Sequence, residues 1–278
     1  PGDLTDCLAA LSDNESELTR LLQYRFTRGK ELSGHTFGNL LIATLTEMEG
    51  DFGQALRVIN RLLSLSGHVY PATAQPVNLV VTKEGGVEVM GEEELREAPG
   101  PVEALRIEPS APAGLPEVAA ALAEADVVVL GPGSLFSSTI PPVLVPSIRD
   151  ALNRSSAKLV YVANIMTEVG ETDGFDAFQH VEALQRHGVR APDVVLVNSA
   201  PIDPERLKNY VSEGAQVVET AAHRFQSAGM RLRHVPMLGR GEYAQHDSAE
   251  LARVLVQLAQ EAGDELPVTK HAPEAALS

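Results

Sequence analysis

The chain has 278 residues and a formal net charge of −16, from 38 acidic and 22 basic residues. This balance argues against a nucleic-acid-binding protein, which needs clustered Lys and Arg, and no run of about 18 apolar residues is present to enter a membrane. The single cysteine, Cys7, excludes an internal disulfide and a multi-cysteine metal site. Because Cys7 stands among leucines at helical spacing, we expect it to be buried.

The first part of the chain, residues 1–70, has the apolar spacing of helices, and Asp51 is placed to cap one of them. We expect helices over residues 3–11, 16–24, 37–48 and 51–66. From residue 77 the period changes to that of strands, with a Gly85-Gly86 turn. We expect strands over residues 77–82, 87–90 and 102–107. The acidic segment 91–101 is interpreted as a solvated connection.

From residue 117 to residue 262, helices and strands alternate. We expect strands over 127–130, 158–163 and 194–197, late edge strands over 216–219 and 232–236, and helices over 117–124, 142–152, 175–187 and 248–262. This alternation predicts an α/β fold that is Rossmann-like, with a mostly parallel sheet and helices on both faces. We therefore expect one domain over residues 1–262 and a disordered tail over 263–278.

Polar loops follow three of the expected parallel strands, where ligands bind in such sheets. The first loop offers close backbone approach at Gly131 and Gly133 and a hydroxyl at Ser134, and the first amides of the following helix would face an anion. The other two loops begin at Asn164 and Asn198. Together they favour a polar, phosphate-bearing ligand. The alternative for the first loop is ordinary turn chemistry.

Several polar residues have two interpretations. Thr172 and Asp173 suit either a ligand contact or the cap of helix 175–187. His35 is either functional or a histidine at a helix start. Ser248 is a phosphorylation candidate, with a helix N-cap as the default. The chain has neither a His-Glu-x-x-His zinc motif nor a Gly-x-Ser-x-Gly nucleophile elbow, which argues against a zinc site and a serine hydrolase.

Several motifs together point to one family. They are Pro1-Gly2-Asp3, Tyr24-Arg25-Phe26, Leu32-Ser33-Gly34-His35-Thr36-Phe37-Gly38-Asn39-Leu40, Gly131-Pro132-Gly133-Ser134-Leu135, Asn164-Ile165-Met166-Thr167 and Gly170-Glu171-Thr172-Asp173-Gly174. Over roughly residues 1–262 the chain resembles the gluconeogenesis factors of the YvcK type, relatives of the CofD-type 2-phospho-L-lactate transferases. Proteins of this type begin with a strand and a Gly-Gly-Gly-Thr-Gly loop, which has no counterpart here before Pro1.

The resemblance implies a cytoplasmic regulatory protein that binds UDP-N-acetylglucosamine and is required for cell shape on gluconeogenic carbon sources. It also implies that Tyr210 and the stretch before His246 are parts of the ligand site. Gln245 stands where the family has an Arg-His-Asp pattern, so a cation that would meet a diphosphate is lost. The predicted ligand-binding residues are Gly131, Gly133, Ser134, Asn164, Thr167, Thr172, Asp173, Asn198, Tyr210, His35 and Asn39.

Two other functions stay open at this point. One is a transferase of the CofD type that moves a phospho-lactyl group from a guanosine diphosphate conjugate to an alcohol. Such a reaction uses Mg²⁺, for which Asp3 is the candidate ligand. The other is a scaffold that acts through protein contacts. Homo-oligomer formation is also left open, and for the regulatory function no cofactor is expected.

Overall fold

The computed structural model describes residues 2–11, 17–29, 32–63, 66–98 and 100–264. By their internal contacts these residues form two compact units. We call residues 1–76 with 113–118 the helical unit, and the rest of the chain the sheet unit. No helix in these described ranges combines the length and the apolar character needed to cross a membrane.

In the helical unit the described residues form four helices before residue 76, and side-chain caps define two of their starts. The helices are α1 (Gly2–Leu11), α2 (Glu17–Leu22), α3 (Phe37–Glu49) and α4 (Phe52–Leu62). Thr36 accepts a hydrogen bond from the amide of Asn39 at the start of α3, at 3.2 Å. Asp51 accepts one from the amide of Gln54 at the start of α4, at 2.8 Å, so its predicted role as a cap is confirmed. The four helices share one apolar core.

The prediction that Cys7 is buried is wrong, because its side chain is exposed. Helix α1 turns Thr5, Leu8 and Ala9 toward the interior. Cys7 precedes Leu8 by one residue, which is about 100° around the helix and away from that face. Leu8 therefore points into the core, while Leu4 and Leu11, which flank Cys7 on its own face of α1, are only half-buried.

A three-stranded antiparallel sheet opens the sheet unit. Its strands are β1 (Asn78–Lys83), β2 (Val87–Met90) and β3 (Val102–Glu108), in the order β2-β1-β3. The segment expected as a solvated connection instead contains helix α5 (Glu92–Glu97), so that expectation is wrong. Leu95 explains the difference. It is fully buried in the core of the unit, so this side of the acidic helix packs against the protein instead of facing solvent.

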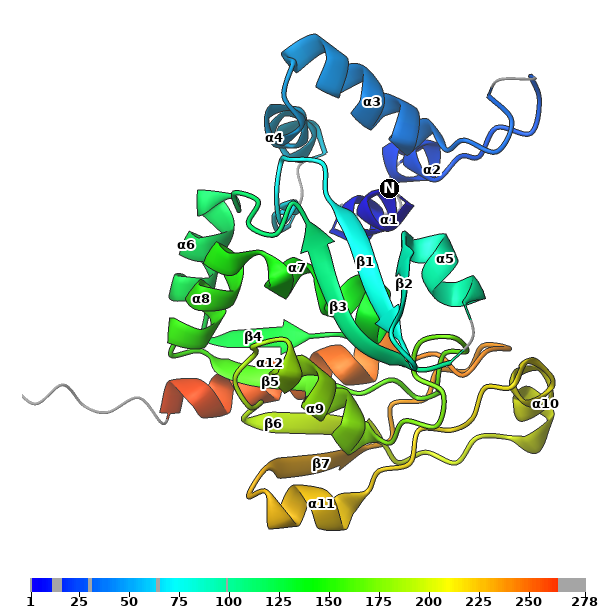
Figure 1. The fold of residues 1–278 in the computed structure, drawn as a ribbon. Coiled ribbons are helices and arrows are strands. Elements are labelled where there is room, and N and C mark those ends of the chain that lie inside the picture. The colour runs from blue at the N-terminus through cyan, green and yellow to red at the C-terminus, as the bar shows by residue number, and fades with distance from the viewer. Residues whose placement is uncertain (1, 12–16, 30–31, 64–65, 99, 265–278) are drawn as a thin grey trace, which may run out of the picture. The chain divides into compact units, whose positions relative to one another are not determined.

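The second sheet is parallel, with strand order β4-β5-β6-β7, which confirms the predicted fold class (Figure 1). The strands are β4 (Val127–Leu130), β5 (Lys158–Val162), β6 (Val194–Asn198) and β7 (Arg231–Val235). Residues 216–219 are not a strand, since they make only one bridge, between Met166 and Val217.

Helices cover both faces of this parallel sheet. Side chains alternate along each strand, so each strand contributes to a core on either face. Along β5, Leu159 and Tyr161 pack in one core with α9, while Val160 and Val162 pack in another core with α12. The remaining elements are α6 (Pro116–Glu124), the π-helical segment η1 (Leu135–Thr139), α7 (Pro141–Leu144), α8 (Pro146–Arg154), α9 (Ala177–Arg186), α10 (Pro204–Glu213), α11 (Ala222–Ser227) and α12 (Ser248–Asp264). Residues 265–278, most of the expected tail, lie outside the described part.

Candidate functional site

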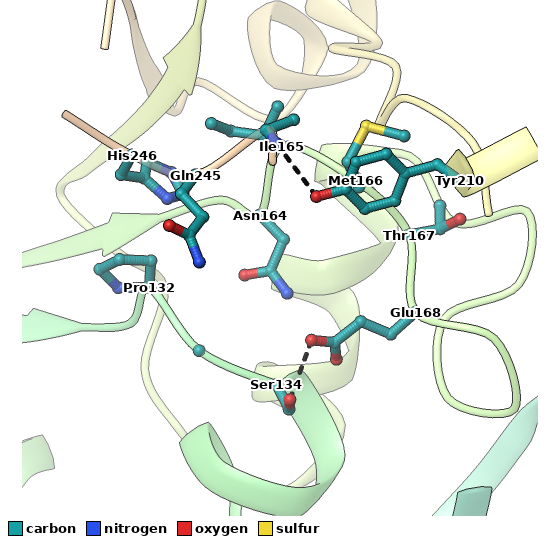
Figure 2. A pocket seen from close by; sticks show the side chains of 12 residues that line it. Pro132, Ser134, Asn164, Ile165, Met166, Thr167, Glu168, Tyr210, Gln245 and His246 are labelled. Atoms are coloured by element: carbon teal, nitrogen blue, oxygen red, sulfur yellow. Dashed lines mark hydrogen bonds between the residues drawn. The ribbon is translucent and has the colours of Figure 1, made fainter. Parts of the chain in front are cut away.

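A cavity of about 440 Å³ lies in the sheet unit, beside the carboxyl ends of β4 and β5 (Figure 2). This volume is in the range of pockets that hold small-molecule ligands. Loops after three strands and one residue of α10 form its walls. The lining residues are Pro132, Gly133, Ser134, Asn164, Ile165, Met166, Thr167, Glu168, Tyr210, Ala244, Gln245 and His246.

The loop after β4 contributes Gly133 and Ser134 to the wall, whereas Gly131 has a structural task. Gly131 has a φ of +76°, and a Cβ on it would lie 2.9 Å from the carbonyl oxygen of Val162. Only glycine fits this left-handed turn so close to β5. Ser134 donates a hydrogen bond to Oε1 of Glu168 over 2.9 Å, so its hydroxyl proton is already used within the protein.

The amides that follow this loop hold an anion, but that anion is a side chain of the protein. The amides of Phe136 and Ser137 both donate to Oε2 of Glu171 at 3.2 Å, and the Ser137 hydroxyl donates to Oε1 at 2.8 Å. Glu171 is only 1% exposed. The carboxylate of Glu171 thus binds the free amides at the start of η1, whereas the sequence places a bound phosphate at the first amides of the helix expected over 142–152.

The loop after β5 contributes Asn164 and Thr167 to the cavity. The Asn164 amide points into the cavity and has no hydrogen-bond partner among the described residues (Figure 2). Thr167 is buried, and its hydroxyl accepts a hydrogen bond from the amide of Gln216 at 2.8 Å. Asn164 is therefore available to a ligand, while Thr167 ties the loop to the chain before α11.

Thr172 and Asp173 fold the loop and do not line the cavity. The Thr172 hydroxyl accepts from the amide of Glu168 at 2.9 Å, and the Asp173 carboxylate accepts from the amide of Gly170 at 2.8 Å. The interpretation of these residues as caps is wrong, because Asp176 caps α9 in a capping box with Gln179.

Glu168 is the carboxyl group of the cavity, and the sequence analysis did not select it. Burial raises its pKa and so does the nearby Glu171 carboxylate, while the hydrogen bond from Ser134 and the charge of Arg96 lower it. Its Oε2 atom is buried without a hydrogen-bond partner within the described part of the chain. The balance favours the protonated form of Glu168 more than in a solvated glutamate.

A buried lysine holds the loop that carries Glu168. Nζ of Lys83, on β1, donates to the carbonyl oxygens of Gly170 and of Gly100, the latter at 3.1 Å. The side chain is 1% exposed. Burial lowers the pKa of Lys83, and the negative charges of Asp173 and Glu171 raise it by a smaller amount. The antiparallel sheet thereby fixes one end of the cavity loop.

Asn198 is the predicted residue of the third strand end, and it lies apart from the cavity lining. Its side chain bonds within its own loop, accepting from the amide of Ala200 at 3.1 Å and donating to the Ala200 carbonyl at 2.9 Å. Asn198 therefore closes a local Asx-type turn, which satisfies its amide without a ligand.

The segment after β7 supplies a wall that the analysis of strand ends did not include. Gln245 directs its amide toward the cavity, and no described residue bonds that amide (Figure 2). Nε2 of His246 lies 3.2 Å from the carbonyl oxygen of Ala163. Because a carbonyl oxygen can only accept a hydrogen bond, Nε2 carries the proton and donates. Nδ1 of the neutral ring is then an acceptor. Burial lowers the pKa of His246, so the ring is neutral at pH 7. The hydroxyl of Tyr210 accepts from the amide of Ala244 at 3.0 Å.

Four predicted residues lie elsewhere in the chain. In the helical unit, His35 is exposed and Asn39 accepts a hydrogen bond from the Thr5 hydroxyl at 2.9 Å. The side chain of Asp3 lies outside the described residues, within which no group of three or more His, Cys, Asp or Glu gathers as metal ligands would. Ser248 is exposed, and Asp247 rather than Ser248 caps α12, bonding the amide of Glu250 at 3.0 Å.

Comparison with known proteins relates the chain to one family. A family model described as 2-phospho-L-lactate transferase CofD matches residues 1–238. A Deinococcus radiodurans protein named "Putative gluconeogenesis factor" is 46% identical over 93% of this chain and 55% of its own length. A Bacillus subtilis protein named "Gluconeogenesis factor" is 36% identical over 94% of this chain and 83% of its own length.

A solved structure agrees with the sequence matches. The crystal structure of a Bacillus halodurans protein aligns with a TM-score of 0.89 and 34% identity, over 92% of this chain and 83% of that chain. The chain thus spans about half of the Deinococcus relative and most of the Bacillus relatives. The family match covers most of the chain, the relatives are similar in sequence, and the Bacillus halodurans structure has the same fold. The chain belongs to the CofD family and, within it, to the gluconeogenesis factors.

Proposed function

We propose that this chain is a regulatory protein of the cytoplasm that binds UDP-N-acetylglucosamine, or a related nucleotide sugar, in the cavity of the sheet unit. We further propose that it supports cell shape during growth on gluconeogenic carbon sources. The names of its relatives support a role connected with gluconeogenesis. The ligand is inferred from the chemistry of the cavity together with the family resemblance.

The single observation that carries the proposal is a pair of unengaged amides in one cavity. Asn164 and Gln245 both reach the cavity, and no described residue uses their hydrogen-bonding groups (Figure 2). A carboxamide carries both a donor and an acceptor, which suits the alternating polar edge of a pyrimidine base. The ring of Tyr210 and the thioether of Met166 supply apolar surface for packing against a base or a sugar.

The charge of the lining determines how a diphosphate binds. No Lys or Arg is among the residues that line this cavity, and Glu168 brings a carboxyl group. A diphosphate therefore relies on hydrogen bonds and on a protonated Glu168 rather than on a guanidinium. We expect modest affinity, with most of the recognition coming from the uncharged parts of the ligand.

Isothermal titration of the chain with UDP-N-acetylglucosamine tests the proposal. Gly133 lines the cavity, its φ is outside the left-handed region, and a Cβ there would make an ordinary contact of 3.7 Å with Thr139, so a leucine adds bulk to the cavity wall without backbone strain. Gly133→Leu should weaken binding at least about tenfold. Gly241→Leu, at a glycine with open space around it and outside the cavity lining, is the control and should bind as wild type does. No heat from wild type, or equal loss in both variants, would refute the proposal.

The description of the matching family model favours a second function, a phospho-lactyl transferase. That activity calls for a guanosine diphosphate conjugate and Mg²⁺ rather than a uridine nucleotide. Thermal shift assays with guanosine and uridine diphosphates, each with and without Mg²⁺, separate the two functions. Stabilisation by the guanosine nucleotide alone would favour the transferase. Stabilisation by the uridine nucleotide would favour the regulatory protein that binds a nucleotide sugar.

A further inference from the structure

The helical unit contains a second cavity, of about 370 Å³, whose walls differ in charge from the first. It is built entirely from residues of that unit: the last two turns of α4, the chain that follows α4, and Glu117. Arg57 and Arg61 lie four residues apart on α4, so their guanidinium groups project from the same side of the helix. Two cations in one cavity are notable in a chain with a net charge of −16.

The two arginines differ in what they already bind. Arg57 donates from Nη2 to Oε1 of Glu117, which fixes its position at the wall. Arg61 is exposed, and its side chain has no ion pair or hydrogen bond among the described residues. A guanidinium presents a planar set of donors that match the oxygens of a phosphate. Arg61 is therefore the group in this cavity that is available for an anion.

Two aromatic side chains also line the cavity. The rings of His68 and Tyr70 are neighbours, 5.7 Å apart between centroids and tilted by 33°. Ring faces of this kind pack against flat or weakly polar surfaces of a ligand, such as the C–H face of a sugar.

Two hydrogen-bond acceptors in the wall lack a donor. Oδ1 of Asn60 and Oε2 of Glu117 are buried, and no hydrogen bond reaches either in the described structure. A buried acceptor without a donor is unfavourable, and a hydroxyl group of a ligand can donate to it. Phosphate oxygens and carboxylates cannot donate, so these acceptors select for a ligand that also carries hydroxyl groups.

We propose that this cavity binds a sugar phosphate, as a site separate from the nucleotide-sugar cavity. Arg61, supported by Arg57, takes the phosphate. Tyr70 and His68 pack against the sugar ring, and Asn60 and Glu117 accept hydrogen bonds from its hydroxyl groups after a small rotation of either side chain. A site of this kind lets one chain respond to a phosphorylated sugar and to a nucleotide sugar at different places.

The test is isothermal titration of the chain with glucose 6-phosphate, with glucose and inorganic phosphate as separate probes. Wild type should bind glucose 6-phosphate with a dissociation constant of about 1 mM or lower, and should bind each partial probe more weakly. Arg61→Met should weaken binding at least about tenfold. Arg154→Met is the matched control, because Arg154 is also an exposed arginine in the last turn of a helix, and it should bind as wild type does.

A second pair of variants tests the aromatic side chains and the separateness of the site. Tyr70→Ala should weaken the binding of glucose 6-phosphate without changing the binding of UDP-N-acetylglucosamine. Gly133→Leu should leave the binding of glucose 6-phosphate unchanged. The proposal is overturned if wild type gives no heat with about 10 mM glucose 6-phosphate, or if the two arginine variants behave alike. It is also overturned if inorganic phosphate binds as tightly as the sugar phosphate, or if Gly133→Leu abolishes binding.

Discussion

Ser134 and Glu168 join two loops of the sheet unit through one hydrogen bond of 2.9 Å, from the Ser134 hydroxyl to Oε1 of Glu168. Ser134 follows β4 and Glu168 follows β5, and both line the same cavity (Figure 2). The pair places a carboxyl group with a raised pKa where a nucleotide sugar would bring its phosphates. If the cavity binds a nucleotide sugar as proposed, the charge of Glu168 makes that binding depend on pH.

The first prediction concerns this link. The raised pKa means that Glu168 takes up a proton as pH falls, and the protonated form no longer repels a diphosphate. Affinity for UDP-N-acetylglucosamine should therefore increase as the pH is lowered from 8 to 5. In Glu168→Gln the affinity should be high and nearly independent of pH over this range. Titration calorimetry at several pH values checks this, and an equal pH dependence in both proteins would contradict it.

The second prediction concerns Glu171, which holds two amides and a hydroxyl of η1. Glu171→Ala leaves these donors buried without a partner and should lower the free energy of unfolding by about 3 kcal/mol or more. Glu171→Gln keeps an acceptor and should lose less. Urea denaturation measures the change. Glu213→Ala, at an exposed position in α10, is the control and should change stability by less than about 0.5 kcal/mol. If Glu171→Ala and Glu213→Ala changed the free energy of unfolding equally, the hydrogen bonds from η1 to Glu171 would contribute nothing to stability.

The third prediction concerns the two reasons for a glycine at position 131, which are its left-handed φ and its close approach to β5. Both Gly131 and Gly174 have a left-handed φ, of +76° and +70°. A Cβ on Gly174 would meet open space, but one on Gly131 would meet the Val162 carbonyl oxygen at 2.9 Å. Gly174→Ala should cost about 1 kcal/mol from φ alone. Gly131→Ala should cost about 1–3 kcal/mol more, because the backbone has to shift. Equal unfolding free energies for the two variants would mean that the close approach to β5 is unimportant.

The fourth prediction concerns acid stability. Burial lowers the pKa of His180, His187 and His246 in the folded chain. A group whose folded pKa is lowered contributes stability above its unfolded pKa, about 6.5, and that contribution is lost as pH falls. The urea midpoint should therefore decrease from pH 7.5 toward pH 5. The raised pKa of Glu168 acts in the opposite direction, so the decrease should be steeper in Glu168→Gln.

His187 allows this dependence to be assigned to one residue. Its Nδ1 donates to the Ala183 carbonyl at 2.7 Å, and its Nε2 accepts from the amide of Leu105 on β3 at 3.0 Å. Protonation of Nε2 removes that acceptor and breaks the second bond. His187→Gln should thus lower stability at pH 7.5 and flatten part of the decrease toward pH 5. If the urea midpoint of His187→Gln decreased with falling pH as steeply as that of wild type, other groups would be responsible for the pH dependence.

The parallel sheet was predictable from sequence, because its strands carry their signal locally. Residues 127–130 and 194–197 are short apolar runs rich in valine, which is typical of strands covered on both faces. The loops after the strands 127–130 and 158–163 are polar, and the rule that ligands bind at strand ends led to Ser134 and Asn164. Both line the cavity.

Other parts of the cavity depend on contacts that no local pattern shows. Glu171 meets the amides of Phe136 and Ser137, 35 and 34 residues earlier in the chain, and no spacing rule predicts that pairing. Gln245 lines the cavity because a long connection after β7 returns to the sheet. Asn198 has the expected place at a strand end, but a local turn already satisfies its side chain.

The most direct test of the central claim is a crystal structure of the chain soaked with UDP-N-acetylglucosamine. We expect electron density for the nucleotide sugar in the cavity of the sheet unit, with its base or sugar hydrogen-bonded to Asn164 and Gln245. Ordered ligand bound elsewhere on the chain, with this cavity holding only water at saturating ligand, would contradict it.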